Sequence, residues 1–550
     1  MQTALAVSCL LAFSTAAAEP SLLPDRVDKA IHDRIANGEY PALVIAVVDG
    51  DRSAVYAFGK LDNGKAPDAD TVFEIGSASK TFTATLLAKS VLDGKLKLDE
   101  PVATLLPGFT IPAHAGKTIT LANLATQHSG LPRLPGNLAP KDVNDPYADY
   151  SGERLKAFLA GYQLTRDPGA KYEYSNLGVG LLGYALAQHA GMSYDALLHR
   201  EIFDPLGMHR SVIALNADLR AHLASGHDVD GKRVANWNFD ALAGAGGIKS
   251  TAADMLRFLQ ANMGTTKTPL YPAMQFAQKP RVDAMDSSNP IGLIWMTRKD
   301  AGGDIVWHNG ETGGYTSFIG FTADRRHGVV VLTNEAVSAD DLGFAILDPK
   351  AELASAKKTV AIKPQLLDAY VGSYQLEPNF ILKILRDGDQ LYAQATGQGA
   401  FPIYASANDE FFAKIAPIGI SFRRDASQKV ASLVLHQGGD RVAPRLTEAQ
   451  ADAAQGHRTM AVDPATLAAY IGHYQLAPGA VFTITIKDGQ LMSQLSGQSA
   501  FPIFASARDK FFYKVVDAQI DFERDAKGSI VALVLHQNGA EQRAARADSH

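Results

Sequence analysis

The sequence contains two copies of one segment, and this repeat limits most strongly what the chain can fold into. Residues 366–437 match residues 466–537 without a gap at a constant distance of 100 positions, so that Tyr370 corresponds to Tyr470 and Leu435 to Leu535. Solenoid repeats are shorter, at about 20–50 residues. We therefore predict two tandem domains and not one continuous array.

Both copies have the pattern of small all-β domains. Short segments of alternating apolar and polar residues, such as 482–486, are separated by Asp-Gly turns and by other Gly and Pro residues. Such spacing is typical of up-and-down barrels or sandwiches. We expect barrel-like domains over residues 364–446 and 463–546, joined by linkers over 348–363 and 447–462.

Residues 25–347 have a different, mixed pattern. Residues 42–48 and 53–58 flank Asp49-Gly50, which predicts a hairpin. Further strands are predicted over 304–307, 315–321 and 328–333, and helices over 81–93, 178–189 and 252–262. Strands at both ends with helices between them indicate an α+β domain, with one antiparallel sheet formed by the two ends and a helical insert.

The first residues have the pattern of a secretory leader. An apolar stretch from Ala4 to Phe13 precedes Ala16-Ala17-Ala18, which predicts a signal peptide over residues 1–18 and a periplasmic or secreted protein. The single cysteine, Cys9, falls inside this leader, so the mature chain has no thiol for a disulfide, a nucleophile or a metal site. No later segment is apolar enough to predict a membrane span.

Composition excludes other classes of protein. Hydrophobic residues make up 46% of the 550 residues, as in folded globular proteins, and the net charge is −6, which does not favour nucleic-acid binding. No phosphate-binding loop is present, and the histidines lack metal-ligand spacing. The segment His227–Gly231 resembles the start of a calcium loop but lacks the later ligands, so a turn is expected there. We expect no cofactor and no metal.

Three short motifs carry residues able to do chemistry. Ser77 and Lys80 stand three positions apart where a helix begins, so the Lys80 amine can reach the Ser77 hydroxyl and take its proton. Ser355 and Lys358 have the same spacing within a predicted linker. A helix cap and a solvated lysine are the simpler interpretation of either pair alone.

The second and third motifs are Tyr174-Ser175-Asn176 and His308-Asn309-Gly310. A tyrosine beside a lysine can have a pKa below its usual value of about 10 and shuttle protons, and Asn176 can orient a substrate amide. Gly310 lets a substrate approach a strand edge closely, and the N–H of Glu311 after it can face an oxyanion. In isolation, a core tyrosine, a capping asparagine and a hairpin turn are the simpler explanation of these residues.

The order S-x-x-K, Y-x-N, H-x-G within one domain resembles the penicillin-recognising serine hydrolases: class C β-lactamases, D-alanyl-D-alanine carboxypeptidases, D-aminopeptidases and their esterase relatives. The resemblance covers residues 25–347. It is supported further by Phe73–Ser77, Gln127–Pro132, Asp204–Met208 and Gly246–Asp254. In that family the fold is a sheet with a helical insert, which agrees with the pattern of strands and helices.

The resemblance implies a role for each residue. Ser77 would be the acyl-accepting nucleophile, Lys80 its base, and Tyr174 the proton relay, while Asn176 would hold the substrate amide. The backbone N–H groups of Ser77 and Glu311 would form the oxyanion hole.

The third motif departs from the β-lactamases of this group, which carry K-T-G where this chain has His308, Asn309 and Gly310. The histidine looks more like the carboxypeptidase and D-peptidase branch. We therefore expect a serine hydrolase that cleaves peptides with D- or unusual residues, including linearised cyclic peptides. β-Lactams and small esters are alternative substrates. Because histidine has a reference pKa of about 6.5, recognition of anionic substrates should weaken between about pH 6 and 8.

A different class of function is also open. A penicillin sensor is acylated and never turns over, and a scaffold protein would hold a ligand on its barrels. The C-terminal domains resemble in architecture the two barrels of D-aminopeptidases. A spacer or a dimerisation module, and with it a homo-oligomer, is an equal alternative for them.

Overall fold

The computed structural model describes residues 20–547 except 285–286, 300–301, 356–358, 378–379, 397–399, 416–417, 438, 455–459, 461, 478–479, 488, 497–499, 514–517 and 538–539. The leader expected over residues 1–18 therefore lies outside the described residues. Within the described part, no helix has the length and apolarity needed to cross a bilayer.

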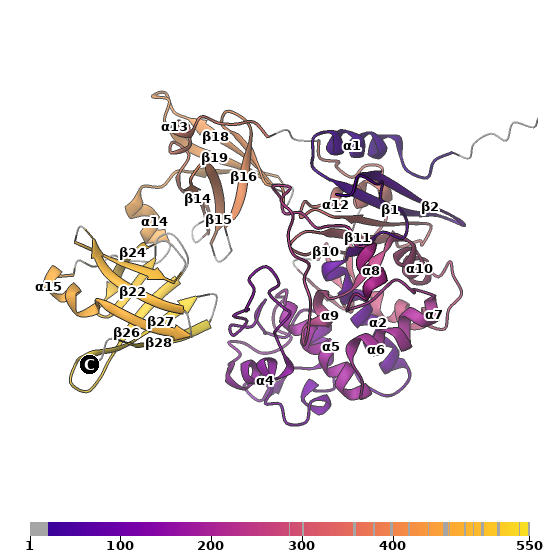
Figure 1. The fold of residues 1–550 in the computed structure, drawn as a ribbon, viewed down its shortest axis with the longest axis horizontal. Coiled ribbons are helices and arrows are strands. Elements are labelled where there is room, and N and C mark those ends of the chain that lie inside the picture. The colour runs from indigo at the N-terminus through magenta and orange to yellow at the C-terminus, as the bar shows by residue number, and fades with distance from the viewer. Residues whose placement is uncertain are drawn as a thin grey trace, which may run out of the picture.

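The first domain is built on an eight-stranded sheet in which its two ends meet (Figure 1). The strand order is β2-β1-β12-β11-β10-β9-β8-β7. The strands are β1 Ala42–Asp49, β2 Arg52–Gly59, β7 Val282–Asp283, β8 Pro290–Ile291, β9 Met296–Arg298, β10 Ile305–Glu311, β11 Thr316–Thr322 and β12 His327–Thr333. Because β1 pairs with both β2 and β12, the predicted hairpin and the predicted α+β sheet are confirmed.

Both faces of this sheet are covered, which explains why β1 is apolar throughout. Leu43 and Ile45 pack with helices α1 (Asp25–Ala36) and α12 (Asp340–Leu347) on one face. Val44 and its alternate neighbours pack against the helical insert on the other face, and Figure 1 shows α1 and the insert on opposite sides of the sheet.

The helical insert is arranged around α2 (Ser79–Leu92), whose first ten residues are all buried. The Phe82 ring of α2 stacks on Phe258 of α10 with 3.8 Å between the ring centroids. The other helices and short strands of this domain are α3 Leu121–Ala125, α4 Gly152–Gly161, α5 Asn176–Ala190, α6 Tyr194–Leu198, α7 Asp204–Leu206, α8 Ala217–Ala221, α9 Ala243–Gly246, α10 Ala252–Met263, α11 Tyr271–Gln278, β3 Val72–Glu74, β4 Ala113–His114, β5 Lys117–Thr118 and β6 Lys249–Thr251. A helix buried on all sides is a rigid support for residues at its N-terminus.

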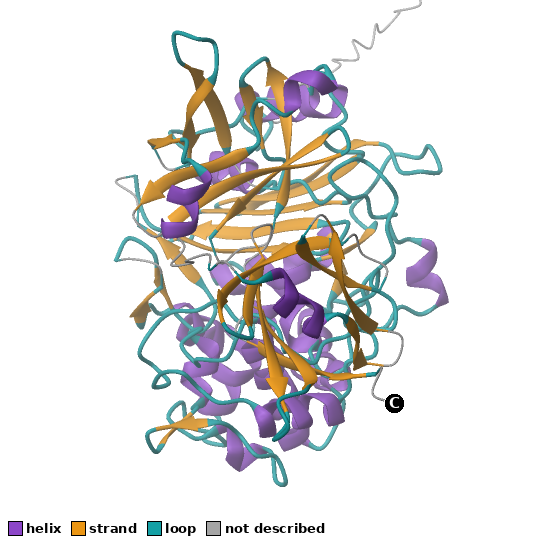
Figure 2. Cartoon of the chain, turned by 90° about the vertical axis from the view of Figure 1, so that its left-hand side faces the viewer, coloured by secondary structure: helices purple, strands orange, loops and turns teal. Residues whose placement is uncertain are grey.

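Each repeat forms eight consecutive antiparallel strands with its own core (Figure 2). The first module has β13 Gly372–Glu377, β14 Phe380–Asp387, β15 Gln390–Ala395, β16 Phe401–Ala407, β17 Glu410–Phe412, β18 Gly419–Arg424, β19 Val430–His436 and β20 Asp440–Pro444, and the second has β21 Gly472–Ala477, β22 Ala480–Lys487, β23 Gln490–Leu495, β24 Phe501–Ala507, β25 Lys510–Tyr513, β26 Ala518–Arg524, β27 Ile530–Gln537 and β28 Ala540–Arg546. The second is a closed barrel, and in the first a single bridge between Tyr374 and Arg445 joins the end strands. Barrel-like domains, predicted from the alternating segments, are confirmed.

The same buried tyrosine contact recurs in both modules. The Tyr374 hydroxyl donates to the Tyr370 carbonyl at 2.7 Å, and the Tyr474 hydroxyl donates to the Tyr470 carbonyl at 2.8 Å. Equivalent contacts at equivalent positions show that the repeated sequence encodes one fold twice.

The two expected linkers contain more structure than their composition predicts. Residues 447–462 include helix α14 (Glu448–Ala454), because Thr447 accepts a hydrogen bond from the Gln450 backbone at 3.3 Å and the segment is rich in strong helix formers. Residues 348–354 pack on helix α1: Arg26 donates to the Ala351 carbonyl at 3.1 Å, and Arg34 donates to the Ala354 carbonyl at 2.7 Å.

The first module touches the first domain at the turn beginning with His227. The Tyr404 hydroxyl donates to Asp230 at 2.9 Å, and Lys414 donates to the Val229 carbonyl at 2.6 Å. Phe504, which cannot make this bond, occupies the equivalent of Tyr404 in the second module. The Asp228 carboxylate accepts hydrogen bonds from the backbone N–H groups of Asp230 and Lys232, which closes the segment as a turn, as expected.

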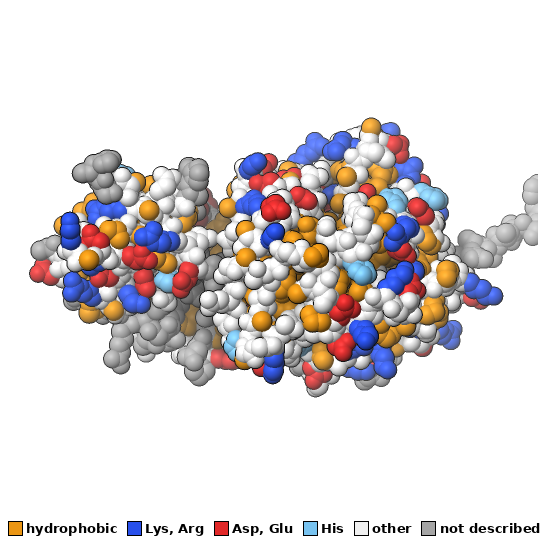
Figure 3. All heavy atoms as spheres, turned by 90° about the horizontal axis from the view of Figure 1, so that it is seen from below, with side chains coloured by type: hydrophobic (Ala, Val, Ile, Leu, Met, Phe, Trp, Pro, Cys, Tyr) orange, Lys and Arg blue, Asp and Glu red, His pale blue; other side chains and the backbone are white. Residues whose placement is uncertain are grey.

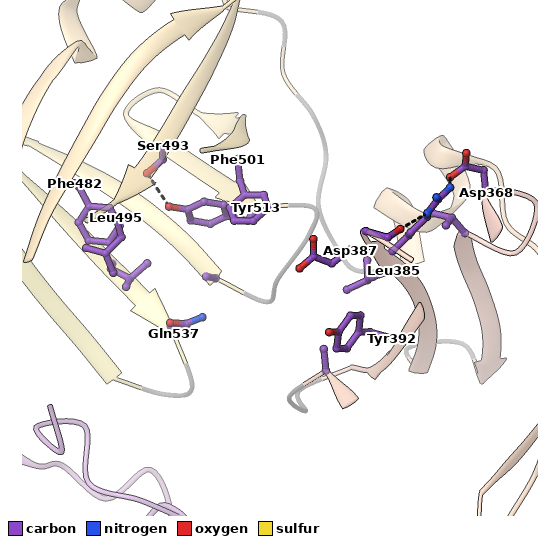
Figure 4. A pocket seen from close by; sticks show the side chains of 16 residues that line it. Asp368, Leu385, Asp387, Tyr392, Phe482, Ser493, Leu495, Phe501, Tyr513 and Gln537 are labelled. Atoms are coloured by element: carbon purple, nitrogen blue, oxygen red, sulfur yellow. Dashed lines mark hydrogen bonds and ion pairs between the residues drawn. The ribbon is translucent and has the colours of Figure 1, made fainter. Parts of the chain in front are cut away.

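The second module touches a different loop of the first domain, through a hydrogen bond from Gln542 to the Gly136 carbonyl at 3.2 Å. A cavity of about 950 Å³ separates the two modules, and in Figure 4 Tyr392 and Asp387 of the first module face it opposite Tyr513 of the second. Figure 3 shows acidic and basic side chains interspersed over the face seen from below.

The packing of residues 348–354 leads to a test by truncation. A chain ending at Ser355 should unfold at least about 2 °C above a chain ending at Leu347, because only the longer chain keeps the hydrogen bonds that Arg26 and Arg34 donate to the carbonyls of Ala351 and Ala354. Calorimetry measures the difference. Equal unfolding temperatures would show that this segment adds nothing to the domain.

Candidate active site

Ser77 and Lys80 lie where the sheet meets the helical insert. Ser77 is in a 3₁₀ turn over Gly76–Ala78, and Lys80 is in the first turn of α2, which follows directly. The Lys80 amine donates to Ser77 Oγ at 2.7 Å and to the Ala245 carbonyl at 2.5 Å. The structure therefore brings the two residues of the first motif into direct contact.

Burial determines the charge of Lys80. Its side chain has no exposed surface, and this desolvation lowers the pKa of the Lys80 amine well below its usual range, with a further decrease from the charge of Arg133. No carboxylate forms an ion pair with it in the described part of the chain. An amine in this setting can exist in the neutral form, which accepts a proton.

Tyr174 completes a hydrogen-bonded cluster around the serine. Its hydroxyl donates to Ser77 Oγ at 2.8 Å. The expectation that the neighbouring lysine lowers the pKa of Tyr174 is wrong, because burial raises it and the hydrogen bond with Ser77 opposes this only in part. Tyr174 is therefore a protonated phenol that donates to Ser77, and the neutral Lys80 amine is the base that can take the proton of Ser77.

The segment carrying Tyr174 is held by Gln127, to which sequence reasoning assigned no role. Gln127 Oε1 accepts from the Ser175 backbone at 2.8 Å, and its carbonyl accepts from Glu173 at 2.8 Å. Its φ of 62° is unusual for a side chain of this size. The amide oxygen of Asn176 is buried and has no hydrogen-bond partner among the described residues, so it is free to accept one from a ligand.

Strand β10 approaches the Ser77 turn so closely that two glycines are required. A Cβ on Gly310 would lie 2.0 Å from the Ile75 carbonyl, and a Cβ on Gly76 would lie 2.6 Å from the Glu311 nitrogen. Gly76 also has a φ of +47°. This contact puts the backbone N–H of Glu311 beside the turn that carries the N–H of Ser77.

His308 is a buried neutral ring, which corrects the expectation that it titrates near neutrality. Only 4% of its surface is exposed, and its Nδ1 donates to the Asn309 carbonyl at 2.6 Å, so its Nε2 can act only as an acceptor. Burial lowers the pKa of His308 to about 3, and the charge of Lys80 adds to this decrease. The ring therefore carries no charge with which to bind a carboxylate at pH 6–8.

The Asn309 side chain lies on the far face of the sheet, away from Ser77. It donates to Asp340 of α12 at 2.7 Å, and burial raises the pKa of that carboxyl to about 7. Successive side chains of a strand alternate between its faces, so His308 and Asn309 cannot both point to the site. The expected role of the Asn309 side chain in substrate binding is therefore wrong.

Arg133 is a second residue near the site that sequence reasoning missed, although it directly follows the Gln127–Pro132 segment. Its guanidinium lies 5.2 Å from the centre of the Tyr174 ring, and the Lys80 amine lies 5.1 Å from the same point.

Ser355 of the duplicate motif is exposed, and its partner Lys358 lies outside the described residues. Among the described residues, no group of three or more His, Cys, Asp or Glu side chains could hold a metal ion.

A serine in contact with a buried lysine and a tyrosine, between a sheet and a helical insert, defines a serine hydrolase of the acyl-transfer type. The chain belongs to the β-lactamase family, whose model matches residues 27–347. A domain of unknown function (DUF3471) matches residues 356–454 and again 457–546.

Two relatives show how far the similarity extends. The D-alanyl-D-alanine-carboxypeptidase/endopeptidase AmpH of Escherichia coli K12 is 28% identical over 361 residues, which cover 62% of this chain and 92% of the relative. A β-lactamase of Pseudomonas fluorescens is 27% identical over 345 residues, which cover 56% of this chain and 92% of the relative.

Solved structures agree with this assignment. A class C β-lactamase of Rhodobacter sphaeroides is 28% identical with a TM-score of 0.50, and covers 57% of this chain and 94% of its own. The D-alanine carboxypeptidase AmpC of Burkholderia cenocepacia is 26% identical with a TM-score of 0.50. The match covers 59% of this chain and 97% of that structure's chain. The similarity includes relatives named for two different substrates, so it identifies the family and leaves the substrate open.

The contact of β10 with the Ser77 turn can be tested with two glycine substitutions. Gly310→Ala should lower kcat/KM by about 100-fold or more, because the new methyl group must push β10 away from Ile75 and so displace the Glu311 N–H. Gly161→Ala, at the end of α4 with no atom within 4 Å of the new Cβ, is the matched control and should be neutral. An active, well-folded Gly310→Ala enzyme would contradict the geometry.

The state of His308 leads to a pH prediction opposite to that from its reference pKa. With its pKa lowered to about 3, the ring stays neutral from pH 6 to 8. The ratio of kcat/KM for an anionic substrate to that for a neutral ester should therefore be constant over this range. A ratio that falls about tenfold would show that His308 becomes charged and binds the anion.

Proposed function

We propose that the protein is a cofactor-free serine hydrolase that forms an acyl-enzyme at Ser77. One observation carries the proposal: Ser77 Oγ lies 2.7 Å from a buried lysine amine with a lowered pKa and 2.8 Å from a protonated tyrosine hydroxyl. An adjacent base of this kind activates a serine without histidine.

Each group has one task in the proposed reaction. Ser77 Oγ attacks the substrate carbonyl as its proton passes to Lys80, and the N–H groups of Ser77 and Glu311 stabilise the oxyanion. The Tyr174 phenol gives its proton to the leaving nitrogen and recovers one from Lys80. Water then cleaves the acyl-enzyme by the reverse path, and Asn176 accepts the N–H of the substrate amide throughout.

We infer that peptides with D- or other unusual residues are the preferred substrates, with linearised cyclic peptides among them. A neutral His308 replaces the lysine of the K-T-G motif, which weakens the case for β-lactams. The AmpH relative supports the same preference for peptides over β-lactams, since it is named a D-alanyl-D-alanine-carboxypeptidase/endopeptidase. β-Lactamase or esterase activity is the alternative, as is a sensor that is acylated once. The leader predicted over residues 1–18 favours a periplasmic or secreted location.

The proposal is tested by labelling and by turnover. A penicillin or a fluorophosphonate should add one acyl or phosphonyl group to the wild type, and Ser77→Ala should remove labelling and lower kcat by about 10⁶. Ser355→Ala is the matched control and should change neither the labelling nor kcat. Intact-mass analysis and a panel of D-peptides, β-lactams and esters give the readouts. Turnover by a folded Ser77→Ala enzyme would contradict the role of Ser77 as the nucleophile. A single burst of product without turnover would support the alternative function as a sensor.

A further inference from the structure

Arg133 differs from Lys80 and His308, the other basic side chains near Ser77, because it is exposed. Lys80 and His308 are buried, and burial lowers the pKa of each. The Arg133 guanidinium lies over the Tyr174 ring, 5.2 Å from its centroid, and no carboxylate of the described residues lies within 4 Å of it. A ligand can therefore supply the ion pair that the described part of the chain does not.

The backbone of Arg133 is bonded to the Y-x-N motif. The Arg133 carbonyl accepts from the backbone N–H of Asn176 at 3.0 Å and from that of Leu177 at 3.2 Å. The Ser175 hydroxyl donates to the preceding carbonyl, that of Pro132, at 2.6 Å. These three hydrogen bonds fix the point from which the Arg133 side chain leaves the backbone.

The loop that begins with Arg133 is held from two further sides. Arg154 donates to the carbonyls of residues 137–139 at 2.7–3.0 Å. Gln542 of the second module donates to the Gly136 carbonyl at 3.2 Å. An exposed side chain on a loop held in this way has a defined place beside the site.

The contact with Tyr174 leaves the guanidinium able to bind an anion. A guanidinium that lies over a ring face keeps N–H donors at its edge, and their fork matches the two oxygens of a carboxylate. The hydroxyl of the same tyrosine lies 2.8 Å from Ser77 Oγ. Arg133 and the reacting oxygen of Ser77 therefore contact the same side chain.

The bond to Asn176 indicates which part of the substrate lies beside Arg133. The buried amide oxygen of Asn176 has no partner among the described residues, and we propose above that it holds the substrate amide throughout the reaction. An amide held throughout belongs to the acyl part, which stays on Ser77 after the leaving group departs. Arg133 is therefore placed beside the acyl part.

We propose that Arg133 is a specificity-determining residue that binds a carboxylate on the acyl part of the substrate. This inference rests on the proposed acyl-enzyme function and adds the chemical class of the acyl group, a residue with a free carboxylate. The positive charge for recognition then comes from the loop of Arg133 and not from β10, where His308 is neutral.

Three penicillins test this role, because they share a phenyl ring and an amide and differ only at the side-chain carbon. Benzylpenicillin is neutral there, carbenicillin carries a carboxylate, and ampicillin carries an ammonium group. The measurement is the second-order rate constant for acylation of the full chain, followed by intact mass. We expect carbenicillin to exceed benzylpenicillin by about three- to tenfold, as for one charge-assisted hydrogen bond at an exposed site, and ampicillin to be slowest. The advantage should shrink at high salt.

Variants at this position assign the effect to the charge. Arg133→Gln should remove the advantage of carbenicillin over benzylpenicillin, Arg133→Glu should place ampicillin above carbenicillin, and Arg133→Lys should keep the wild-type order. Ratios to benzylpenicillin cancel any effect of Arg133 on Lys80. Arg508→Gln, at an exposed position in the second module, is the control for net charge and should leave every rate unchanged. Ratios that do not change, or three penicillins slowed by one common factor, would show a merely structural role and overturn the proposal.

Failure of the proposed function has a different signature. If no penicillin acylates Ser77, the acyl-enzyme proposal loses its support, and the role of Arg133 is then tested by binding. Calorimetry of the full chain should show that carbenicillin binds about three- to tenfold more tightly than benzylpenicillin, and that Arg133→Gln removes the difference. Equal affinities, or no binding of either compound, would overturn the role of Arg133.

Discussion

The close approach of β10 to the turn at Ser77 is the constraint on which the site depends. Because Gly310 and Gly76 have no side chains, the strand edge and the turn can lie directly against each other. Helix α2 begins directly after this turn, which places Lys80 against Ser77. A sheet buried on both faces supports one side of this contact, and a helix buried on all sides supports the other.

Desolvation then decides which groups are charged. Lys80 and His308 are the basic side chains deepest in the site, and burial lowers the pKa of both, so that neither supplies a stable positive charge. Arg133, by contrast, is exposed, and its guanidinium lies 5.2 Å from the centre of the Tyr174 ring. The site therefore combines neutral acid–base groups at Ser77 with a guanidinium near the Tyr174 ring.

The two C-terminal modules show how a duplicated fold acquires two contacts. Their cores repeat the same tyrosine hydrogen bonds, whereas Tyr404 and Gln542 stand where the other copy has Phe504 and Arg441. Surface residues can change without cost to a packed core, so each module docks on its own loop of the catalytic domain. The loop held by Gln542 begins at Arg133, which connects the second module to the rim of the site.

Local patterns in the sequence determined the α+β domain, the two barrel-like modules and the three motifs around Ser77, because strand alternation, turn residues and spacing along a helix are local properties. Only the tertiary structure decided the charge of His308, the direction of the Tyr174 pKa shift, the face on which Asn309 lies and the position of Arg133 near the site. These depend on how deeply each group is buried and on which distant segments surround it. Desolvation and charge–charge interactions act through space, and no spacing along the chain encodes the residues that meet at β10, α2 and the loop of Arg133.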